Sequence, residues 1–479
     1  MIEDLIRDRR RKCDAYEKSA PAFPARVKRT KTIGDFLADF DPKSGKKTSV
    51  VGRLYAWRDQ GKLIFSDLRD GYGKIQIVLN ERETKGFVLA KENVDIGDFL
   101  EAEGTPFLTK RGEKSILAKS VRIVAKSLRP IPSSWYGVED PDIRLRKRYL
   151  DFLINEETKE IFRKKEIFWS SVRSFLKSEG FLEVEMPVLE PVPGGAEAEP
   201  FVTHHNALDQ DFYLRISLEL PLKKMLVGGF ESVFEIGRIF RNEGISREHL
   251  QDYTQMECYR SYWDYREMMK FVESMYKNVI KKTFGSSVRA WEGKKVDWGK
   301  KWKTVDYYEV FKKEAGIDLS RASDAELLKK AKSVGASVRA GMGRGRVIDL
   351  IYKKTVRPKL IDPCFLINPP VEVEPLAKRL EGDPSRVERF QVLAYGTELG
   401  KGFSELNDPR DQRSRFEEQM KLRAAGDEEA QRLDEDFLEA LEYGMPPAAG
   451  FGMSERLFAV LLEKPVRETV IFPLMRRER

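Results

Sequence analysis

Residues suited to chemistry are concentrated in the stretch Arg238–Tyr259, RIFRNEGISREHLQDYTQMECY. Apolar and polar residues alternate at both of its ends, which predicts an outgoing strand, a long loop and a returning strand. Because side chains alternate along a strand, Arg241 and Glu243 are expected on one face of the first strand. The returning strand is expected to place four side chains on one face: Tyr253, Gln255, Glu257 and Tyr259. Charges of both signs would then face a single pocket.

A solvent-exposed hairpin is the alternative, because strand alternation is common. Such a hairpin would be expected to turn through Asn-Gly or Asp-Gly. The tip GISREHLQD is instead long, and it contains one of only 3 histidines in the chain. Loops of this length are usually functional, so the sequence favours a binding or catalytic site.

Length and composition indicate a basic protein of several domains. The 479 residues predict two or three domains, and 34% charged with 11% aromatic residues is typical of a well-packed soluble chain. The net charge of +8 favours a polyanionic partner, for which nucleic acid is the first candidate. The sequence shows no apolar run of about 18 residues and no secretory signal, which predicts a cytoplasmic protein without a membrane span. Cys13, Cys258 and Cys364 lack disulfide or zinc spacing, as expected in a reducing compartment.

Two parts are expected in the first third of the chain. Residues 1–45 predict a basic helical extension, and five short β-rich runs within residues 46–127 predict a small Greek-key barrel of the OB-fold kind. Such barrels carry a face on which unpaired bases stack on aromatic rings. Arg58, Phe65 and Gln76 suit that face, although each of them alone is more often ordinary barrel structure.

One larger domain is expected over residues 145–479, after a Pro-rich linker at 128–144. Apolar residues between Ile161 and Leu176 recur at helical spacing, and Gly180 ends the predicted helix. The sequence FLEVEMP that follows alternates as a half-buried strand does. The helix and strand predict either a subunit interface or ordinary core packing.

Three other features receive no role in the predicted chemistry. Residues about 275–345, rich in Lys and Trp, predict an inserted helical segment. The sequence GMGRGR at 341–346 looks like a phosphate-binding glycine loop, but it does not lie between a strand and a helix in the required pattern. His204 and His205 have no partner carboxylate at the spacing of a metal site.

Several separated segments resemble the class II lysyl-tRNA synthetases. The resemblance runs from Val50 to the C-terminus and is carried by LRPIP, VPGGAEAEPFVTHHNALDQDFYLRISLEL, GGFESVFEIGRIFRNEGIS, VEVEPLAKR, GFSELNDP, GMPPAAGFG and VRETVIFPLM. The pairing of GFSELND with FVTHHNALD is specific to the lysine enzymes rather than to their aspartate and asparagine relatives. The resemblance implies an α+β fold, with a class II antiparallel-sheet catalytic domain and an N-terminal OB-fold β-barrel that binds the anticodon.

The implied activity is that of a lysine–tRNA ligase. ATP would convert L-lysine to lysyl-adenylate and pyrophosphate, and the lysine would then pass to the 3′ end of tRNA(Lys). The lysine carboxylate is already an anion at neutral pH, so the site requires no histidine or cysteine base. It must instead hold two anions in line and neutralise charge at phosphorus. The resemblance also implies Mg²⁺ bound with ATP, and a homodimer formed through residues 157–187.

Site residues follow from the resemblance, position by position. Arg241 would bridge the lysine carboxylate and the α-phosphate, and it is grouped with Glu257 and Arg456 as catalytic. The implied ATP-binding residues are Arg241, Glu243, His249, Tyr253, Glu398 and Arg456. The implied lysine-binding residues are Gly195, Glu219, Arg241, Tyr259, Phe403 and Glu405. The implied anticodon contacts are Arg58, Phe65, Gln76 and Glu113.

The amino-acid subsite implied by the resemblance recognises both ends of lysine. Glu219 and the backbone near Gly195 would hold the α-amino group, and Tyr259 and Glu405 would hold the ε-ammonium group. Phe403 would form an apolar wall beside the aliphatic stem. A neutral amino acid would leave the carboxylate of Glu405 buried without a cation, which favours lysine by several kcal/mol, on the order of 3–5.

The sequence departs from the family pattern near ATP. Glu248 and Leu250 flank His249 where relatives read Arg-His-Asn, and Arg247 stands one place earlier as a substitute cation. Glu398 remains as the magnesium ligand, whereas Gln391 stands where relatives place a second glutamate.

Lys401 is a further departure, because it replaces an asparagine near the substrate. It would either pair with the lysine carboxylate or compete for Glu405. These departures motivate a second hypothesis, a tRNA-binding paralogue with impaired adenylation. A third hypothesis is an enzyme that attaches an amino acid to a protein lysine, but such relatives lack the N-terminal barrel.

Overall fold

The computed structural model describes residues 2–132, 140–244, 246, 249–339, 342–427 and 430–477. The chain divides into two compact units, residues 1–141 and 142–479. Within these described ranges, no helix is long and apolar enough to cross a lipid bilayer.

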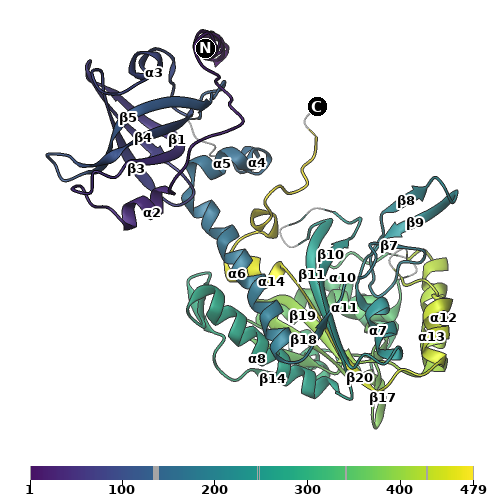
Figure 1. Cartoon of the computed structure of the whole chain (residues 1–479). Coiled ribbons are helices and arrows are strands. Elements are labelled where there is room, and N and C mark those ends of the chain that lie inside the picture. The colour runs from purple at the N-terminus through teal and green to yellow at the C-terminus, as the bar shows by residue number, and fades with distance from the viewer. Residues whose placement is uncertain are drawn as a thin grey trace. The chain divides into compact units, whose positions relative to one another are not determined.

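The first unit is built on a closed barrel with the strand order β1-β2-β3-β5-β4 (Figure 1). Its strands are β1 (Thr48–Asp59), β2 (Leu63–Arg69), β3 (Lys74–Asn80), β4 (Phe99–Leu108) and β5 (Lys114–Ala125). Alternate residues of each strand point inwards, so aliphatic side chains such as Leu54, Ile77 and Ile123 fill the interior. The five strands expected from the sequence are therefore all present.

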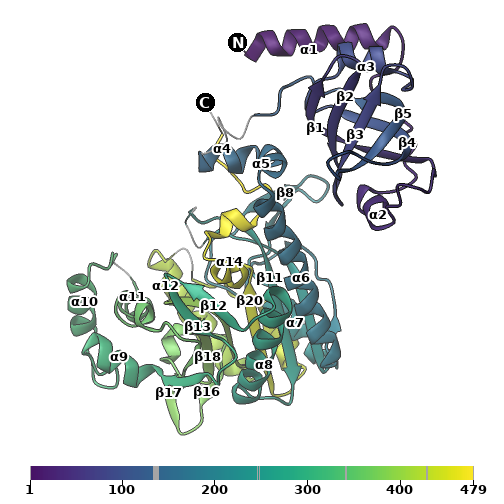
Figure 2. The same cartoon turned by 90° about the vertical axis from the view of Figure 1, so that its left-hand side faces the viewer.

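Three helices accompany the barrel: α1 (Ile2–Glu17), α2 (Ile33–Ala38) and α3 (Phe87–Asn93). In Figure 2, α1 and α3 lie at one end of the barrel and α2 lies at the other. Tyr16 of α1 is buried in the barrel core, and Arg9 donates hydrogen bonds to the carbonyls of Ser127 at 2.8 Å and Ile96 at 2.9 Å. The N-terminal helix is thus part of the barrel unit rather than a separate extension.

The expected linker at 128–144 falls partly on residues 133–139, which lie outside the described residues. Its last residues are helical, because α4 (Pro141–Arg146) begins within it. Leu128 packs against the barrel core.

The second unit contains an eight-stranded sheet in the order β14-β15-β18-β19-β20-β11-β10-β6. The strands are β6 (Leu182–Glu183), β10 (Ser232–Phe240), β11 (Asp252–Ser261), β14 (Lys303–Asp306), β15 (Cys364–Ile367), β18 (Arg389–Ala394), β19 (Thr397–Ser404) and β20 (Ala448–Ser454). Neighbours in the centre of the sheet pair antiparallel, whereas the edge pairs β14–β15 and β6–β10 are parallel. The implied class II antiparallel sheet is therefore present.

One face of this sheet is covered by α6 (Glu156–Ser178) and α8 (Tyr265–Phe284) (Figure 1). Met256 and Cys258 of β11 point to that side and belong to its core. The other face packs against α7 (Glu219–Val227), α12 (Pro409–Ala424) and α13 (Glu435–Glu442). Because strand residues alternate, Glu257 and Tyr259 point to this second side.

Smaller elements complete the unit. The helices are α5 (Arg148–Ile154), α9 (Tyr307–Ala315), α10 (Asp324–Ser333), α11 (Arg344–Thr355) and α14 (Arg456–Leu461). The strands are β7 (Leu189–Glu190), β8 (Val202–His205), β9 (Gln210–Leu214), β12 (Val288–Trp291), β13 (Lys294–Asp297), β16 (Arg379–Leu380) and β17 (Asp383–Val387). The 3₁₀ turns are η2 (Arg357–Lys359), η3 (Val371–Val373) and η4 (Val466–Thr469).

Two expectations about this unit are wrong in part. The segment 275–345 is not a purely helical insertion, because its first residues complete α8, residues 288–297 form a hairpin, and β14 joins the main sheet. FLEVEMP forms only the two-residue β6, and its Leu182 is 47% exposed instead of buried. The preceding helix does end as expected, with Gly180 at φ 85° directly after it.

Candidate active site

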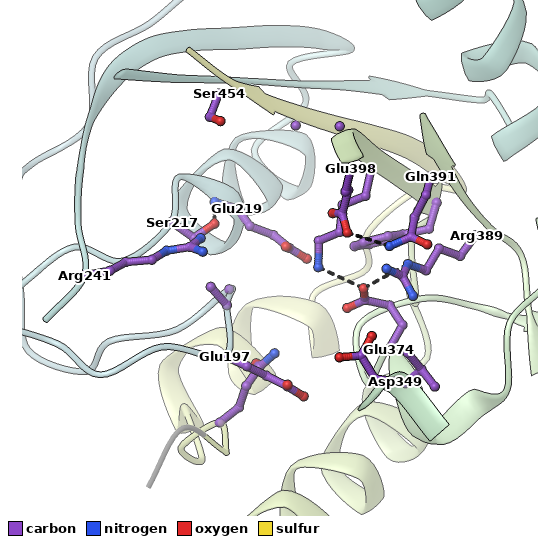
Figure 3. A pocket seen from close by; sticks show the side chains of 18 of the residues that line it. Glu197, Ser217, Glu219, Arg241, Asp349, Glu374, Arg389, Gln391, Glu398 and Ser454 are labelled. Atoms are coloured by element: carbon purple, nitrogen blue, oxygen red, sulfur yellow. Dashed lines mark hydrogen bonds and ion pairs between the residues drawn. The ribbon is translucent and has the colours of Figure 1, made fainter. Parts of the chain in front are cut away.

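A cavity of about 960 Å³ opens on the second face of the sheet. Its floor is formed by β11, β20 and β19 (Figure 3). Gly450 of β20 lies between Tyr259 of β11 and Phe403 of β19 in the strand register, and Gly452 follows on the same face. Because Gly450 has no side chain, the side chains of Glu405 and Tyr259 can lie over this central strand, where a Cβ atom at position 450 would overlap both of them.

The hairpin β10–β11 contributes as expected on its returning strand. Four side chains of β11 line the cavity: Tyr253, Gln255, Glu257 and Tyr259. The carboxylate of Glu257 is only 4% exposed, and it accepts hydrogen bonds from Ser217 Oγ at 2.8 Å, the Leu218 backbone N–H at 3.0 Å and the Tyr259 hydroxyl at 2.8 Å. A carboxylate held by so many donors fixes the position of its neighbours.

The outgoing strand differs from the expectation, because β10 ends at Phe240. Arg241 and Glu243 therefore lie in the loop, and the prediction that they share a strand face is wrong. Both still line the cavity, since the backbone N–H of Arg241 bonds to the Gln251 carbonyl at 2.8 Å and extends the pairing of the hairpin. The Arg241 side chain donates to the Ile216 carbonyl at 3.2 Å, and Figure 3 shows it reaching towards Ser217.

The tip of this loop is described only in part. His249 and Leu250 line the cavity, and Ser246 Oγ lies 2.8 Å from His249 Nδ1. The departures predicted at Arg247 and Glu248 lie outside the described residues.

Two buried carboxylates mark one end of the cavity. Glu219 at the start of α7 is 4% exposed, and Glu405 directly after β19 is 1% exposed. Burial raises the pKa of Glu219 to about 7 and raises the pKa of Glu405 well above its ordinary value. Phe403, also buried, lies on the same wall, and the backbone of Gly195 comes so close to Ser217 that a Cβ atom there would lie 2.9 Å from that side chain. All five lysine-site residues other than Arg241 thus meet at this end.

A buried lysine, which the sequence interpretation missed, lies between these carboxylates. Lys223 Nζ is 2.5 Å from an oxygen of Glu219 and 2.5 Å from an oxygen of Glu405. The spacing of Glu219 and Lys223 by four residues in a predicted helix was the available signal, because such residues share a helix face.

Lys401 does not compete for Glu405, so that alternative is wrong. Its ammonium group donates to Glu374 at 2.8 Å. Arg389 Nε lies 3.3 Å from the same carboxylate oxygen (Figure 3). Burial by itself would raise the pKa of Glu374, but Lys401 and Arg389 together hold that pKa below its ordinary value. Neither Glu374 nor Arg389 was identified from the sequence.

Glu398 and Gln391 face each other across β18 and β19, with Gln391 Nε2 donating to Glu398 Oε2 at 2.7 Å. Arg456, the first residue of α14, donates to the backbone carbonyl of Glu398 at 3.4 Å. Glu398, Gln391 and Arg456 all line the cavity. Within the described ranges, no cluster of three or more His, Cys, Asp or Glu residues could hold a metal ion unaided.

The segment GMGRGR was wrongly set aside in one respect. Of the residues described between α10 and α11, none forms a strand, as expected, but Gly343 is the N-cap of α11, and residues 343–346 line the cavity together with Asp349. By contrast, His204 and His205 lie on the exposed strand β8 away from the cavity lining. His204 does have carboxylate partners, Asp211 at 2.9 Å and Asp209 at 3.4 Å, although the sequence interpretation found none.

The four barrel residues expected at an anticodon lie close together on β1, β2, β3 and the turn before β5. Arg58 pairs opposite Phe65, and Asp67, opposite Gln76, accepts a hydrogen bond from Arg58 at 2.8 Å. Gln76 Oε1 accepts a hydrogen bond from Ser115 Oγ at 3.1 Å, two residues after the exposed Glu113. The strand register thus gathers these side chains on one outer surface of the barrel.

Comparisons with known proteins agree with both units. Residues 140–476 match the family of tRNA synthetases class II (D, K and N), and residues 48–124 match the OB-fold nucleic acid binding domain. A lysine–tRNA ligase of Moorella thermoacetica is 46% identical over 91% of this chain and 90% of its own length. A lysine–tRNA ligase of Carboxydothermus hydrogenoformans is 41% identical over 99% of this chain and 98% of its own length. A lysine–tRNA ligase of a Roseiflexus species is 43% identical over 95% of this chain and 94% of its own length.

Proposed function

This chain belongs to the class II tRNA synthetases of the D, K and N group, and we propose on that premise that it is a lysine–tRNA ligase whose cavity joins lysine to ATP. The observation that carries the proposal is the meeting of Arg241, Glu219 and Glu405 in one cavity. The guanidinium group of Arg241 complements the carboxylate of an amino acid, and the buried carboxylates of Glu219 and Glu405 complement two ammonium groups.

Activation begins with the lysine carboxylate, which is the nucleophile. One of its oxygens attacks the α-phosphorus of ATP, a P–O bond forms, and the bond to the bridging oxygen breaks to release pyrophosphate. No proton needs to be removed, so the chain supplies position and charge. The guanidinium of Arg241 suits both anions because its planar N–H groups bind two oxygens at once, and Glu257 holds the surrounding wall rigid through its hydrogen bonds.

Selection of lysine is assigned to the buried end of the cavity. Glu219 and the backbone at Gly195 receive the α-amino group, Glu405 and the Tyr259 hydroxyl receive the ε-ammonium group, and Phe403 contacts the stem. The sequence interpretation expected Glu405 to lack a cation until lysine binds, which is wrong because Lys223 already contacts its Oε2. The burial of Glu405 still supports this assignment, because its Oε1 accepts no hydrogen bond from the described residues and can gain from a second cation. A substrate with an uncharged side chain would not make this favourable electrostatic interaction with Glu405.

ATP is assigned to the part of the cavity next to the loop and α14. Tyr253 and Arg456 would enclose the adenine, with Glu243 and His249 at its edge. Glu398 with the amide of Gln391 fits a magnesium ion that phosphates and water otherwise coordinate, since such an ion needs only one or two protein oxygens. Mg²⁺ held there would neutralise phosphate charge when ATP is bound.

Transfer of lysine requires tRNA, and the barrel surface around Arg58, Phe65, Gln76 and Glu113 is assigned to the anticodon. The match of residues 48–124 to a nucleic acid binding domain supports that assignment. We also propose a homodimer through residues 157–187, supported by the exposure of the apolar residues Ile167 (40%) and Leu182 (47%) in that region. The three cysteines are free and buried, which supports a reducing cytoplasm.

The proposal is tested by lysine-dependent exchange of pyrophosphate into ATP, followed by charging of tRNA(Lys). Both activities are expected in the purified full chain, and solution mass measures the dimer. Binding of tRNA without any lysine-dependent exchange would instead support the paralogue with impaired adenylation. Exchange followed by transfer to a protein rather than to tRNA would support the protein-modifying alternative.

A further inference from the structure

Lys223 connects the two carboxylates that are assigned to the two ends of lysine. Its Nζ lies 2.5 Å from Glu219 Oε1 and 2.5 Å from Glu405 Oε2, and its side chain is fully buried. Because both oxygens are bound to the same nitrogen, they can be no farther apart than twice that distance. One ammonium group therefore fixes the separation of two carboxylates that come from α7 and from the end of β19.

Each carboxylate retains one oxygen that Lys223 does not contact. Oε1 of Glu405 is buried and accepts no hydrogen bond from the described residues. It lies beside Gly450, where a Cβ atom would overlap it. The carboxylate of Glu219 is directed into the cavity in Figure 3. Both free oxygens are thus available to an incoming amine.

Aromatic rings hold Lys223 in place from the other sides. Its Nζ lies 5.3 Å from the centre of the Phe403 ring and 6.0 Å from that of Phe437. The other charged or titratable groups that face the cluster are Glu257, Tyr259, Glu374 and Lys401. Lys401 is already paired with Glu374, and the Tyr259 hydroxyl donates to Glu257. Lys223 is therefore the cation in direct contact with Glu219 and Glu405.

We propose that Lys223 is a positioning residue that binds one oxygen of Glu219 and one oxygen of Glu405, and so sets the distance between the sites for the α-amino and ε-ammonium groups. The inference rests on the proposed function. It makes Lys223 a length selector: an amino acid whose two ammonium groups match the fixed separation meets both free oxygens, whereas ornithine, one methylene shorter, reaches only one at a time.

Lys223 also counteracts the effect of burial on the pKa of both carboxylates. Burial raises the pKa of both groups, and Lys223 is the largest influence in the opposite direction. Without it, both carboxylates would hold protons to higher pH, and the variant would need a higher pH to bind an ammonium group.

The test compares Lys223→Met, which keeps the length of the side chain but removes its charge, with Lys223→Arg, which keeps the charge but alters its geometry. The kcat/KM values for lysine and ornithine are measured by ATP–pyrophosphate exchange across a pH series. In the Met variant, we expect the ratio of kcat/KM for lysine to that for ornithine to fall by about tenfold or more, the usual discrimination for one methylene. Use of lysine should recover as the pH rises, with the KM for ATP unchanged. Lys224→Met, next in the sequence but paired with the exposed Asp436, is the matched control and should behave as the wild type.

The outcomes separate this inference from the proposed function. A wild-type chain without lysine-dependent exchange would refute the function itself. A wild-type chain that exchanges, with variants that lose lysine and ornithine use in equal proportion and with an unchanged pH profile, would show that Lys223 only supports the fold. If the Met variant does not fold, the Arg variant decides, because an unaltered lysine-to-ornithine ratio in a folded Arg variant contradicts length selection.

Discussion

Replacement of Glu405 by Gln is the most direct test of how the cavity selects its amino acid. The change keeps the size of the side chain and removes only its charge. Glu405 is 1% exposed, and its Oε1 accepts no hydrogen bond from the described part of the chain. In Glu405→Gln, the ε-ammonium group of lysine would therefore be buried without a counter-ion, while Lys223 would retain Glu219 as its partner.

The expected loss of kcat/KM for lysine can be estimated from the burial of the ion pair that Glu405 would form with the ε-ammonium group. Removing one partner of a buried ion pair costs roughly 3–5 kcal/mol. At about 1.36 kcal/mol for each factor of ten, kcat/KM for lysine should fall by about 150- to 5,000-fold. The loss should reside mainly in the KM for lysine, because the residues assigned to ATP lie at the other end of the cavity.

The assay is lysine-dependent ATP–pyrophosphate exchange with lysine and ATP varied in turn. Glu439→Gln, an exposed carboxylate on α13 outside the cavity lining, is the matched control and should leave both KM values unchanged. A variant whose KM for lysine stays within about threefold of the wild type, far below the several kcal/mol expected for a buried pair, would refute the assignment of Glu405. An equal rise in the KM for ATP would point to a general distortion of the cavity instead.

Three further predictions concern the cavity floor, the pH dependence of lysine binding and the barrel surface. Gly450→Ala places a methyl group against Glu405 and Tyr259. Overpacking of about 1–3 kcal/mol should lower kcat/KM for lysine by about 5- to 150-fold, as measured by ATP–pyrophosphate exchange. Near-normal kinetics would mean that lysine does not bind against Gly450. Burial raises the pKa of Glu219 to about 7, so this carboxylate becomes neutral as the pH falls below that value. The KM for lysine should then rise while the KM for ATP does not. If both KM values change with pH in the same way, the assignment of Glu219 to the α-amino group is contradicted. Phe65→Ala should raise the KM for tRNA in the charging assay by about 5- to 150-fold, since stacking contributes about 1–3 kcal/mol per base, without changing exchange; equal loss of both activities would refute this division of labour.

Much of the fold was predictable because it follows from local patterns of apolar and polar residues. The barrel strands, the helix that ends before Gly180 and the returning strand β11 each have a repeat of two or 3.6 residues that requires no knowledge of distant contacts. Prediction was poorest where an element is short or forms only because a strand that is distant in the sequence pairs with it. FLEVEMP alternates over more residues than the two that pair with β10, and β14 is a strand because β15 lies beside it.

We could infer the family, the two folded units and the residue types that the chemistry needs from the amino-acid sequence alone, because motifs and periodicity are properties of neighbouring residues. The pairing of the buried charges, by contrast, became known from the three-dimensional structure. Competition for Glu405 was one of the two alternatives for Lys401, yet Lys401 of β19 bonds to Glu374, and Lys223 of α7 contacts Glu405. Buried charges select partners by distance and desolvation in three dimensions, and these quantities are fixed only when α7, β11 and β19 pack around a common floor.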